Sequence, residues 1–227
     1  MTDNTTALVV FSGGQDSTTC LFWAMEKFTK IQAISFDYGQ RHNIELQIAE
    51  KICEKYSITH EILAVNSLKE LGGNSLTMDS MAVTFEATEN SLPNTFVPGR
   101  NIIFLTLAAA RAYQMNITNI VTGVGQEDYS GYPDCREEFV ESMEKTLRLG
   151  TDKAFVIHRP LMFLNKAEIW ELSDQLGHLQ EIIESTHTCY NGIRDQLHDW
   201  GYGCGSCPAC KLRADGYRLY MEKKNGI

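Results

Sequence analysis

One short segment, residues 12–17 (SGGQDS), constrains the fold of this chain more than any other feature of its 227 residues. It follows residues 7–11 (ALVVF), an apolar run rich in valine that is typical of a strand buried on both faces. A helical stretch, residues 16–28, comes next. The first N–H groups of a helix have no backbone partner, and together with the helix dipole they bind anions. Two adjacent glycines let a phosphate approach the main chain closely. The segment therefore predicts a phosphate-binding turn between a strand and a helix.

The residues that follow repeat this alternation of buried strands and amphipathic helices. Residues 31–36 are apolar enough for a second buried strand. Residues 43–56 place Ile44, Ile48 and Ile52 on one helix face. Residues 58–65 then alternate as a third strand. The order β-α-β-α-β implies a parallel sheet with right-handed crossovers.

The second half of the chain extends the same pattern. Helices are expected at 101–115, 135–149 and 166–176, and further strands at 119–122 and 155–158. The predicted fold class is therefore α/β, with a doubly wound, five-stranded parallel sheet. Between these halves, residues 71–98 are polar and lack periodicity, which inside a compact domain indicates a functional loop or lid.

Charge and hydropathy narrow the range of partners. The chain has 20 Lys and Arg against 29 Asp and Glu, for a formal net charge of -9. This balance disfavours an electrostatic grip on nucleic acid and favours small molecules such as a Mg²⁺-nucleotide. The longest apolar run, residues 102–110, is too short to span a bilayer, and the N-terminus does not resemble a signal peptide. We expect a soluble, cytoplasmic protein that does not bind membranes.

Three of the seven cysteines lie within seven residues, which indicates a metal site rather than disulfides. These are Cys204, Cys207 and Cys210, and Cys189 supplies a fourth sulfur that completes a tetrahedron. Zinc suits such a structural site, while an iron–sulfur cluster uses the same ligands and is not distinguished by spacing. His187 and His198 are alternative ligands. A helix is expected after Pro208, so residues 186–227 are predicted to form a zinc-binding helical tail on an α/β domain of residues 1–185.

Other polar segments follow predicted strands or begin predicted helices, where ligands of doubly wound sheets bind. Phe36 and Tyr38 end the second strand, in position to meet a nucleoside. Arg100 precedes the alanine-rich helix and can bind a carboxylate or a phosphate through two hydrogen bonds. Residues 123–136, with two tyrosines and several carboxylates, predict a pocket for a heteroaromatic substrate. Lys166 opposes the dipole of the helix that it begins, which indicates a neighbouring anion.

The SGGQDS segment resembles the pyrophosphate-binding loop of the PP-loop ATP pyrophosphatases, which cleave ATP between the α and β phosphates. This resemblance implies an adenine nucleotide alpha hydrolase-like, Rossmann-like fold. Nearly the whole chain resembles the 7-cyano-7-deazaguanine synthase family of queuosine-precursor biosynthesis. The matching segments are VVFSGGQDSTTCL, FVPGRN, TGV, SGYPDCR, LNKAE and TCYNG with CGSCPACKLR. SGYPDCR together with the four-cysteine tail makes the match specific.

The family resemblance implies an ATP-dependent ligase that converts 7-carboxy-7-deazaguanine and ammonia into the 7-cyano product, through adenylated and amide intermediates. It also implies ATP, Mg²⁺ and structural Zn²⁺ as cofactors, and a homodimer. The residues to which these roles carry over form four groups. Catalysis is expected from Asp16, Lys166 and Arg100. Nucleotide binding is expected from Phe11, Ser12, Gly13, Gly14, Gln15, Asp16, Ser17, Thr18, Phe36, Tyr38 and Gly123. Substrate binding is expected from Arg100, Asn101, Tyr129, Ser130, Tyr132, Asp134 and Arg136. Metal binding is expected from Cys189, Cys204, Cys207 and Cys210.

One feature departs from the family pattern. Fourteen residues separate Cys189 from Cys204, and this gap is longer than in the family. We expect the extra residues to bulge outward as a loop and to leave the metal site intact.

Two alternative functions remain compatible with the phosphate loop. A PP-loop enzyme that transfers sulfur to tRNA would need a basic RNA-binding extension and usually a catalytic cysteine pair. A nucleotide sensor with a metal-ribbon module would bind ATP without turnover. The acidic charge balance speaks against the first, and pyrophosphate release that depends on a deazaguanine would exclude the second.

Overall fold

A computed structural model of the chain describes residues 3–40, 43–77, 92–126 and 132–226. Five parallel strands form one sheet in the order β3-β2-β1-β4-β5. Their bounds are β1 Asp3–Val10, β2 Lys30–Asp37, β3 Thr59–Ala64, β4 Ile117–Val121 and β5 Val156–His158. The predicted α/β class and the five-stranded parallel sheet are therefore confirmed.

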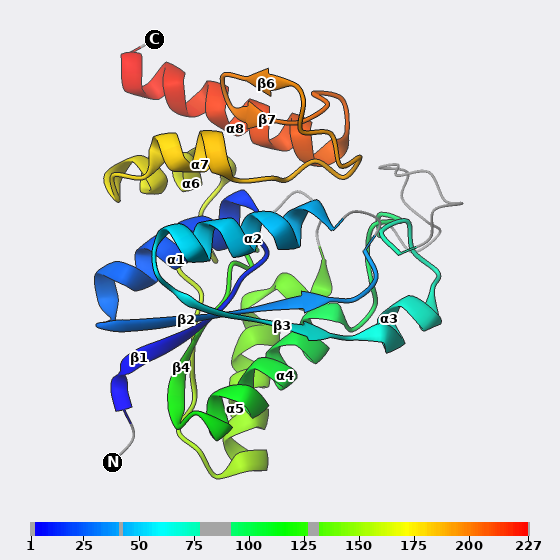
Figure 1. Cartoon of the computed structure of the whole chain (residues 1–227), viewed down its shortest axis with the longest axis vertical. Helices are drawn as coiled ribbons and strands as arrows, with labels where there is room; N and C mark the ends of the chain where they lie inside the picture. The colour runs from blue at the N-terminus through cyan, green and yellow to red at the C-terminus, as the bar shows by residue number, and fades with distance from the viewer. Residues whose placement is uncertain (1–2, 41–42, 78–91, 127–131, 227) are drawn as a thin grey trace.

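Helices cover both faces of the sheet (Figure 1). Helices α1 (Gln15–Lys27) and α2 (Ile44–Lys55) lie on one face, and α4 (Arg100–Gln114) and α5 (Glu137–Thr151) lie on the other. The alternation of β1 matches this arrangement, because Ala7 and Val9 pack with α1 and α2 whereas Leu8 packs with α4. Both faces of β1 are buried, which explains its continuous apolar sequence.

The chain order creates a switch point beside the central strand. From β1 the chain winds outward through β2 to β3, then crosses back to β4 on the other side of β1. The loops that leave β1 and β4 therefore diverge to opposite faces at the carboxyl edge of the sheet. In open α/β sheets, ligands bind in the crevice at this point.

Several short elements were not predicted. Helix α3 (Asn66–Leu71) buries only Leu68, and α7 (Leu179–Ser185) spans seven residues. Helices this short show no reliable apolar period. The helix expected at residues 135–149 is present as α5, and an unpredicted 3₁₀ turn, Pro133–Cys135, precedes it. The loop predicted at 71–98 lies in large part outside the described residues.

The C-terminal part forms a further layer on the side of α1 (Figure 1). It contains α6 (Lys166–Gln175), α7, a small antiparallel hairpin of β6 (Leu197–His198) and β7 (Gly201–Tyr202), and α8 (Pro208–Asn225). A third apolar cluster joins this layer to α1 through Phe22, Trp170, Ile182, Trp200 and Tyr220. Among the helices of the described residues, none combines the length and the apolar character that crossing a membrane would require.

The residues between Cys189 and Cys204 do not simply bulge outward, so that expectation is wrong in part. They form the β6–β7 hairpin, whose Trp200 is buried and stacks on His198 with ring centroids 4.5 Å apart. Arg194 donates hydrogen bonds to the carbonyls of Glu184 and Ser185 at the end of α7, and to that of Thr186. These contacts tie the hairpin to the body because they satisfy carbonyl groups that the helix end leaves unpaired.

Candidate functional site

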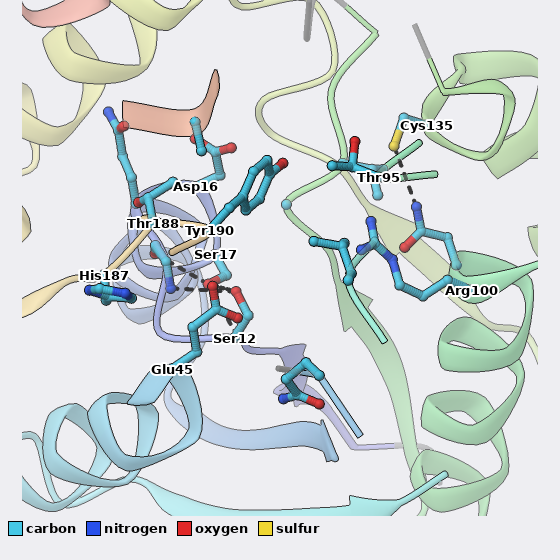
Figure 2. Close-up of a pocket in the computed structure, with 18 of the residues that line it drawn as sticks. Ser12, Asp16, Ser17, Glu45, Thr95, Arg100, Cys135, His187, Thr188 and Tyr190 are labelled. Atoms are coloured by element: carbon cyan, nitrogen blue, oxygen red, sulfur yellow. Dashed lines mark hydrogen bonds between the residues drawn. The ribbon is translucent and has the colours of Figure 1, made fainter. Parts of the chain in front are cut away.

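A cavity of about 330 Å³ opens at the carboxyl edge of the sheet, between β1 and β4. Figure 2 shows its walls: the turn after β1, the first residue of α4, and the segment after α7 that contains His187, Thr188 and Tyr190. The N-terminal turn of α8 also contributes. Segments distant in the sequence therefore meet at the switch point of the sheet.

The phosphate loop, residues 12–17, is held by hydrogen bonds within itself. The Ser17 hydroxyl accepts from the Ser12 N–H at 3.2 Å and lies 3.0 Å from the Ser12 hydroxyl. Gly13 has φ +75°, and a Cβ there would lie 2.7 Å from the carbonyl oxygen of Glu45. Gly14 is the N-cap of α1, and no side chain caps the helix. The first N–H groups of the helix are thus left without a side-chain cap, as a phosphate site requires.

Asp16 and Lys166 form an ion pair across the cavity floor. Lys166 begins α6, where Asn165 and Glu168 form a capping box. Its ammonium donates a hydrogen bond to the Asp16 carboxylate at 2.6 Å. Gly216 of α8 allows α6 to pack closely, because a Cβ there would lie 2.5 Å from the Cβ of Lys166. The anion expected beside Lys166 is therefore the carboxylate of Asp16.

The opposite wall is built on the start of α4. The Asn101 main-chain N–H donates to the Asp134 carboxylate at 3.1 Å, and the Asn101 amide donates to the Asp134 carbonyl at 3.0 Å. The Tyr132 and Thr95 hydroxyls lie 2.5 Å apart. Burial disfavours the charge of Arg100, but the neighbouring Tyr38 phenol and other groups raise its pKa, so it stays cationic. This wall presents one fixed cation and an ordered polar rim to a ligand.

The remaining walls come from β2 and from the turn after β4. Phe36 stacks on Phe104 with centroids 4.3 Å apart, and Tyr38 lies at the same edge. Gly123 lies against α1, where a Cβ would be 3.2 Å from the main-chain nitrogen of Ser17. The glycine therefore keeps the space above the phosphate loop open.

The structure brings most of the expected site residues to this cavity. Those that line it are Phe11, Ser12, Gly14, Gln15, Asp16, Ser17, Phe36, Tyr38, Arg100, Asn101, Gly123, Tyr132 and Lys166. Gly13, Thr18 and Asp134 support these residues from behind: the Thr18 hydroxyl donates to the Gly14 carbonyl at 2.7 Å. Arg136 is exposed and is not among the lining residues. Tyr129 and Ser130 lie outside the described residues.

Sequence reasoning assigned no role in this cavity to two titratable groups that line it. Glu45, in the first turn of α2, faces the phosphate loop, and burial raises the pKa of its carboxyl to about 7 although Arg100 attracts its charge. His187 is fully buried, and within the described residues its ring nitrogens have no hydrogen-bond partner. Burial lowers the pKa of His187 to about 4, so its imidazole is neutral. A polar residue at the start of a predicted helix was the signal that could have identified Glu45.

Arg213 was also missed, because it lies in a helix expected only to carry the cysteines. Its guanidinium is buried and donates hydrogen bonds to the carbonyls of Trp200 and Ile182 and to the Thr188 hydroxyl. These bonds connect α8 to the end of α7 and to the cavity wall. Arg213 therefore orders the segment that carries Thr188 into the cavity.

The four predicted metal ligands converge. The sulfur atoms of Cys189, Cys204, Cys207 and Cys210 all lie within 4.8 Å of one another. The sulfur of Cys204 lies 3.9 Å from that of Cys210, and the sulfur of Cys207 lies 4.0 Å from that of Cys189. Both distances are close to the separation of about 3.8 Å between sulfurs on one tetrahedral zinc. Hydrogen bonds from Cys207 and Cys210 lower the pKa of the Cys189 thiol. The histidines considered as alternatives are not part of this group. The four sulfurs fit a single metal ion.

Comparison with known proteins places the chain first in a class. The parallel sheet is shared with a U34-tRNA thiolase, NcsA, from Methanococcus maripaludis, solved with its 4Fe-4S cluster. The TM-score is 0.51 at 15% identity, over 98% of this chain and 68% of that one. At this identity the likeness shows the fold alone, and it agrees with the adenine nucleotide alpha hydrolase-like fold expected from the sequence.

The family follows from sequence similarity. The model of the queuosine biosynthesis protein QueC matches residues 6–221. A 7-cyano-7-deazaguanine synthase of Clostridium acetobutylicum is 53% identical over 94% of this chain and 96% of its own length. One from Staphylococcus haemolyticus is 51% identical over 96% and 94%, respectively. The chain belongs to the QueC family of queuosine biosynthesis proteins.

Proposed function

We propose that this protein is a 7-cyano-7-deazaguanine synthase, an ATP-dependent ligase that makes the nitrile from 7-carboxy-7-deazaguanine and ammonia. The observation that carries the proposal is the shared cavity of the phosphate loop, Lys166 and Arg100. One wall of this cavity is suited to a polyphosphate and the other to an anionic, planar acid. The similarity to synthases over nearly the whole chain supports the identity of that acid.

The chemistry explains why these groups are needed together. A carboxylate is a poor electrophile until one of its oxygens becomes part of a leaving group. In the proposed first step, a substrate carboxylate oxygen attacks the α-phosphorus of ATP, and pyrophosphate leaves. Two anions must approach each other, so positive charge that is already in place lowers the barrier. The N–H groups of the phosphate loop, Lys166 and Arg100 supply that charge.

The following steps use the same site twice. Ammonia attacks the acyl carbon, AMP leaves, and an amide forms. The amide oxygen then attacks the α-phosphorus of a second ATP, and pyrophosphate leaves. Departure of AMP, which carries that oxygen away, together with loss of the two protons on the amide nitrogen, leaves the nitrile. Asp16 positions Lys166 through their ion pair, and Tyr132, Asn101 and Asp134 shape the wall that receives the deazaguanine.

We further propose that the four cysteines hold one structural Zn²⁺, and that Mg²⁺ accompanies ATP. Four sulfurs within 4.8 Å fit one ion better than a cluster, because in a 4Fe-4S cluster each thiolate binds a different iron. The ion would link the segment of Cys189 to the start of α8. In this proposal residues 1–185 form the nucleotide-binding α/β domain. Residues 186–227 form the metal-binding part that packs on it and contributes Thr188 and Tyr190 to the cavity wall. Elemental analysis of the purified protein is expected to give about one zinc per chain, and iron in its place would contradict the zinc assignment.

The proposal also covers partners. The substrates are small molecules, in keeping with the acidic charge balance. The family resemblance supports a homodimer in the cytoplasm, which sedimentation analysis and cell fractionation would test. Among the described cysteines outside the metal group, Cys20, Cys53 and Cys135 are buried free thiols on three different elements, α1, α2 and the 3₁₀ turn. This arrangement does not favour a sulfur-transfer mechanism that uses a cysteine pair.

The direct test is incubation with ATP, Mg²⁺, ammonia and 7-carboxy-7-deazaguanine, followed by mass spectrometry. The expected products are the amide and then the nitrile, with AMP and pyrophosphate. Omitting ammonia should stop the reaction at the adenylate. Failure to release AMP and pyrophosphate with all substrates present would refute the proposal.

A further inference from the structure

Two carboxylates reach the cavity among its described lining residues, and they differ in their partners. Asp16 is already neutralised by Lys166 at 2.6 Å. The Glu45 carboxylate has no hydrogen bond or ion pair with any described residue, although its side chain is partly buried. A half-buried carboxylate without a partner is costly, so in a functioning site it needs a cation or a proton. Glu45 is therefore the carboxylate of this cavity that is available to a cation brought in with a ligand.

The position of Glu45 identifies the part of the ligand that it meets. The first turn of α2 rests on the phosphate loop, since a Cβ on Gly13 would lie 2.7 Å from the Glu45 carbonyl and 2.9 Å from the Ala49 nitrogen. Figure 2 shows the Glu45 side chain extending from this turn toward Ser12 and Ser17. A phosphate on the loop would therefore face the Glu45 carboxylate. Two anions this close require a cation between them.

Resting on the proposed function, we propose that Glu45 supplies the protein carboxylate that binds the Mg²⁺ of ATP, in contact with the phosphates held by residues 12–17. Mg²⁺ prefers oxygen ligands and is typically held by one or two carboxylates together with substrate phosphates and water. Asp16, which the SGGQDS pattern places in the loop, instead holds Lys166. In this assignment Asp16 holds Lys166 in place, and Glu45 binds the metal ion.

Other features of the site are consistent with this assignment. Arg100 exerts the largest attraction on the Glu45 charge, yet it forms no ion pair with it and stands on the opposite wall. Burial raises the pKa of Glu45 to about 7, as expected for a carboxylate without its cation. Among the described residues, none therefore places a cation in contact with the Glu45 carboxylate.

The test measures metal binding rather than turnover. Mn²⁺ replaces Mg²⁺ and is followed by electron paramagnetic resonance, with and without α,β-methylene-ATP, which cannot be cleaved at the reacting bond. We expect Glu45→Gln to weaken nucleotide-dependent Mn²⁺ binding at least about tenfold. Glu45→Asp should retain part of the affinity because it keeps the charge. Glu50→Gln, an exposed glutamate of the same helix, is the matched control and should bind Mn²⁺ like the unmodified protein.

Three results would overturn the inference. The first is Mn²⁺ binding by Glu45→Gln equal to that of the unmodified protein. The second is a loss found in Asp16→Asn instead of in Glu45→Gln, which would make Asp16 the ligand. The third is a Glu45→Gln defect confined to the KM for ammonia, which would make Glu45 the group that receives ammonium. The third result comes from a separate steady-state assay with ammonia and 7-carboxy-7-deazaguanine. The Mn²⁺ measurement uses neither substrate, so its failure is distinct from failure of nitrile formation. If the unmodified protein shows no nucleotide-dependent Mn²⁺ binding, the proposed use of ATP fails as well.

Discussion

The phosphate loop and the four-cysteine site show two different ways in which a short motif becomes a site. The loop, residues 12–17, is continuous, and its N–H groups are aimed by the strand before it and the helix after it. The cysteine site joins Cys189 to three sulfurs across the β6–β7 hairpin, so its geometry depends on long-range packing. The comparison teaches that the first site is preorganised by the main chain, whereas the second would be completed by a bound metal ion.

The two sites are also mechanically connected. The main-chain N–H of His187 donates a hydrogen bond to the Gly13 carbonyl at 3.1 Å, and Cys189 follows two residues later. The segment between them, with Thr188, lines the cavity. Loss of the metal is therefore expected to disturb the cavity wall as well as the tail, while damage to the loop should leave the tail folded.

The largest effect is expected from the ion pair at the cavity floor. Asp16→Ala and Lys166→Ala should each lower kcat/KM by about a thousandfold or more, because positive charge held in place for the adenylation step is lost or misplaced. Both side chains are partly exposed, so the melting temperature should change by only a few degrees, about 2–4 °C per kcal/mol. Pyrophosphate release and thermal unfolding measure the two quantities.

The control for this pair is Lys223→Ala, which removes an exposed ion pair with Glu171 between α6 and α8. It should leave turnover unchanged, since exposed pairs contribute little. Turnover retained in Asp16→Ala would contradict the role given to the pair.

The next effect concerns the metal site. Cys207→Ala should abolish stoichiometric metal binding, unfold the tail and reduce turnover, because metal binding and folding are coupled in such sites. Metal analysis, hydrogen exchange of α8 and the activity assay follow these losses separately. The matched control is Cys53→Ala, a buried thiol of α2 outside the metal group. If α8 of the Cys207→Ala protein exchanged its amide hydrogens as slowly as in the unmodified protein, packing alone would be sufficient to keep the tail folded.

A smaller effect is expected when the loop is strained without loss of charge. Gly13→Ala places a Cβ 2.7 Å from the Glu45 carbonyl at a residue with φ +75°. We expect destabilisation by about 1–3 kcal/mol and weaker ATP binding, with the metal retained. Gly177→Ala separates strain from crowding, because that glycine has φ +77° and no atom within 4 Å of an added Cβ. Denaturant unfolding and nucleotide titration measure the outcome, and equal effects in the two variants would exclude crowding as the cause.

The smallest effect is expected from the hairpin. Arg194→Ala removes hydrogen bonds to three carbonyls at the end of α7 and a cation–π contact with Tyr202. The expected loss of stability is about 1–3 kcal/mol, with turnover nearly unchanged. Arg194→Lys should recover only part of it, since an ammonium cannot bridge the same carbonyls. Denaturant unfolding provides the measurement. Unchanged stability in Arg194→Ala would show that these contacts do not stabilise the protein.

The parts of the fold that could be predicted are those that repeat a pattern. Buried strands of four to eight apolar residues and amphipathic helices of three turns carry their own periods, so β1, α2 and β4 were expected near their observed positions. Helices α3 and α7 have too few residues to show a period. The hairpin is decided by Trp200, whose burial depends on α7 and α8 and not on its neighbours in the chain.

The features of the site also divide into those that the sequence indicates and those that only the fold decides. A main-chain anion site, and cysteines spaced for one metal, are properties of short segments, and sequence alone was sufficient to indicate both. Sequence alone could not say which carboxylate is paired. Asp16 stands 150 residues before Lys166, and the partner of each depends on how α6 packs against α1.

What the sequence by itself determined is therefore the set of parts: a phosphate loop after a buried strand, four cysteines spaced for one metal, and an alternation that predicts a parallel α/β sheet. The tertiary structure alone decided the assignments. It paired Asp16 with Lys166, brought Glu45 over the loop, left Arg136 outside the cavity and set Trp200 in the core. The physical reason is that turns and helix termini are local, whereas charge pairing and burial depend on which distant segments share a dry interior.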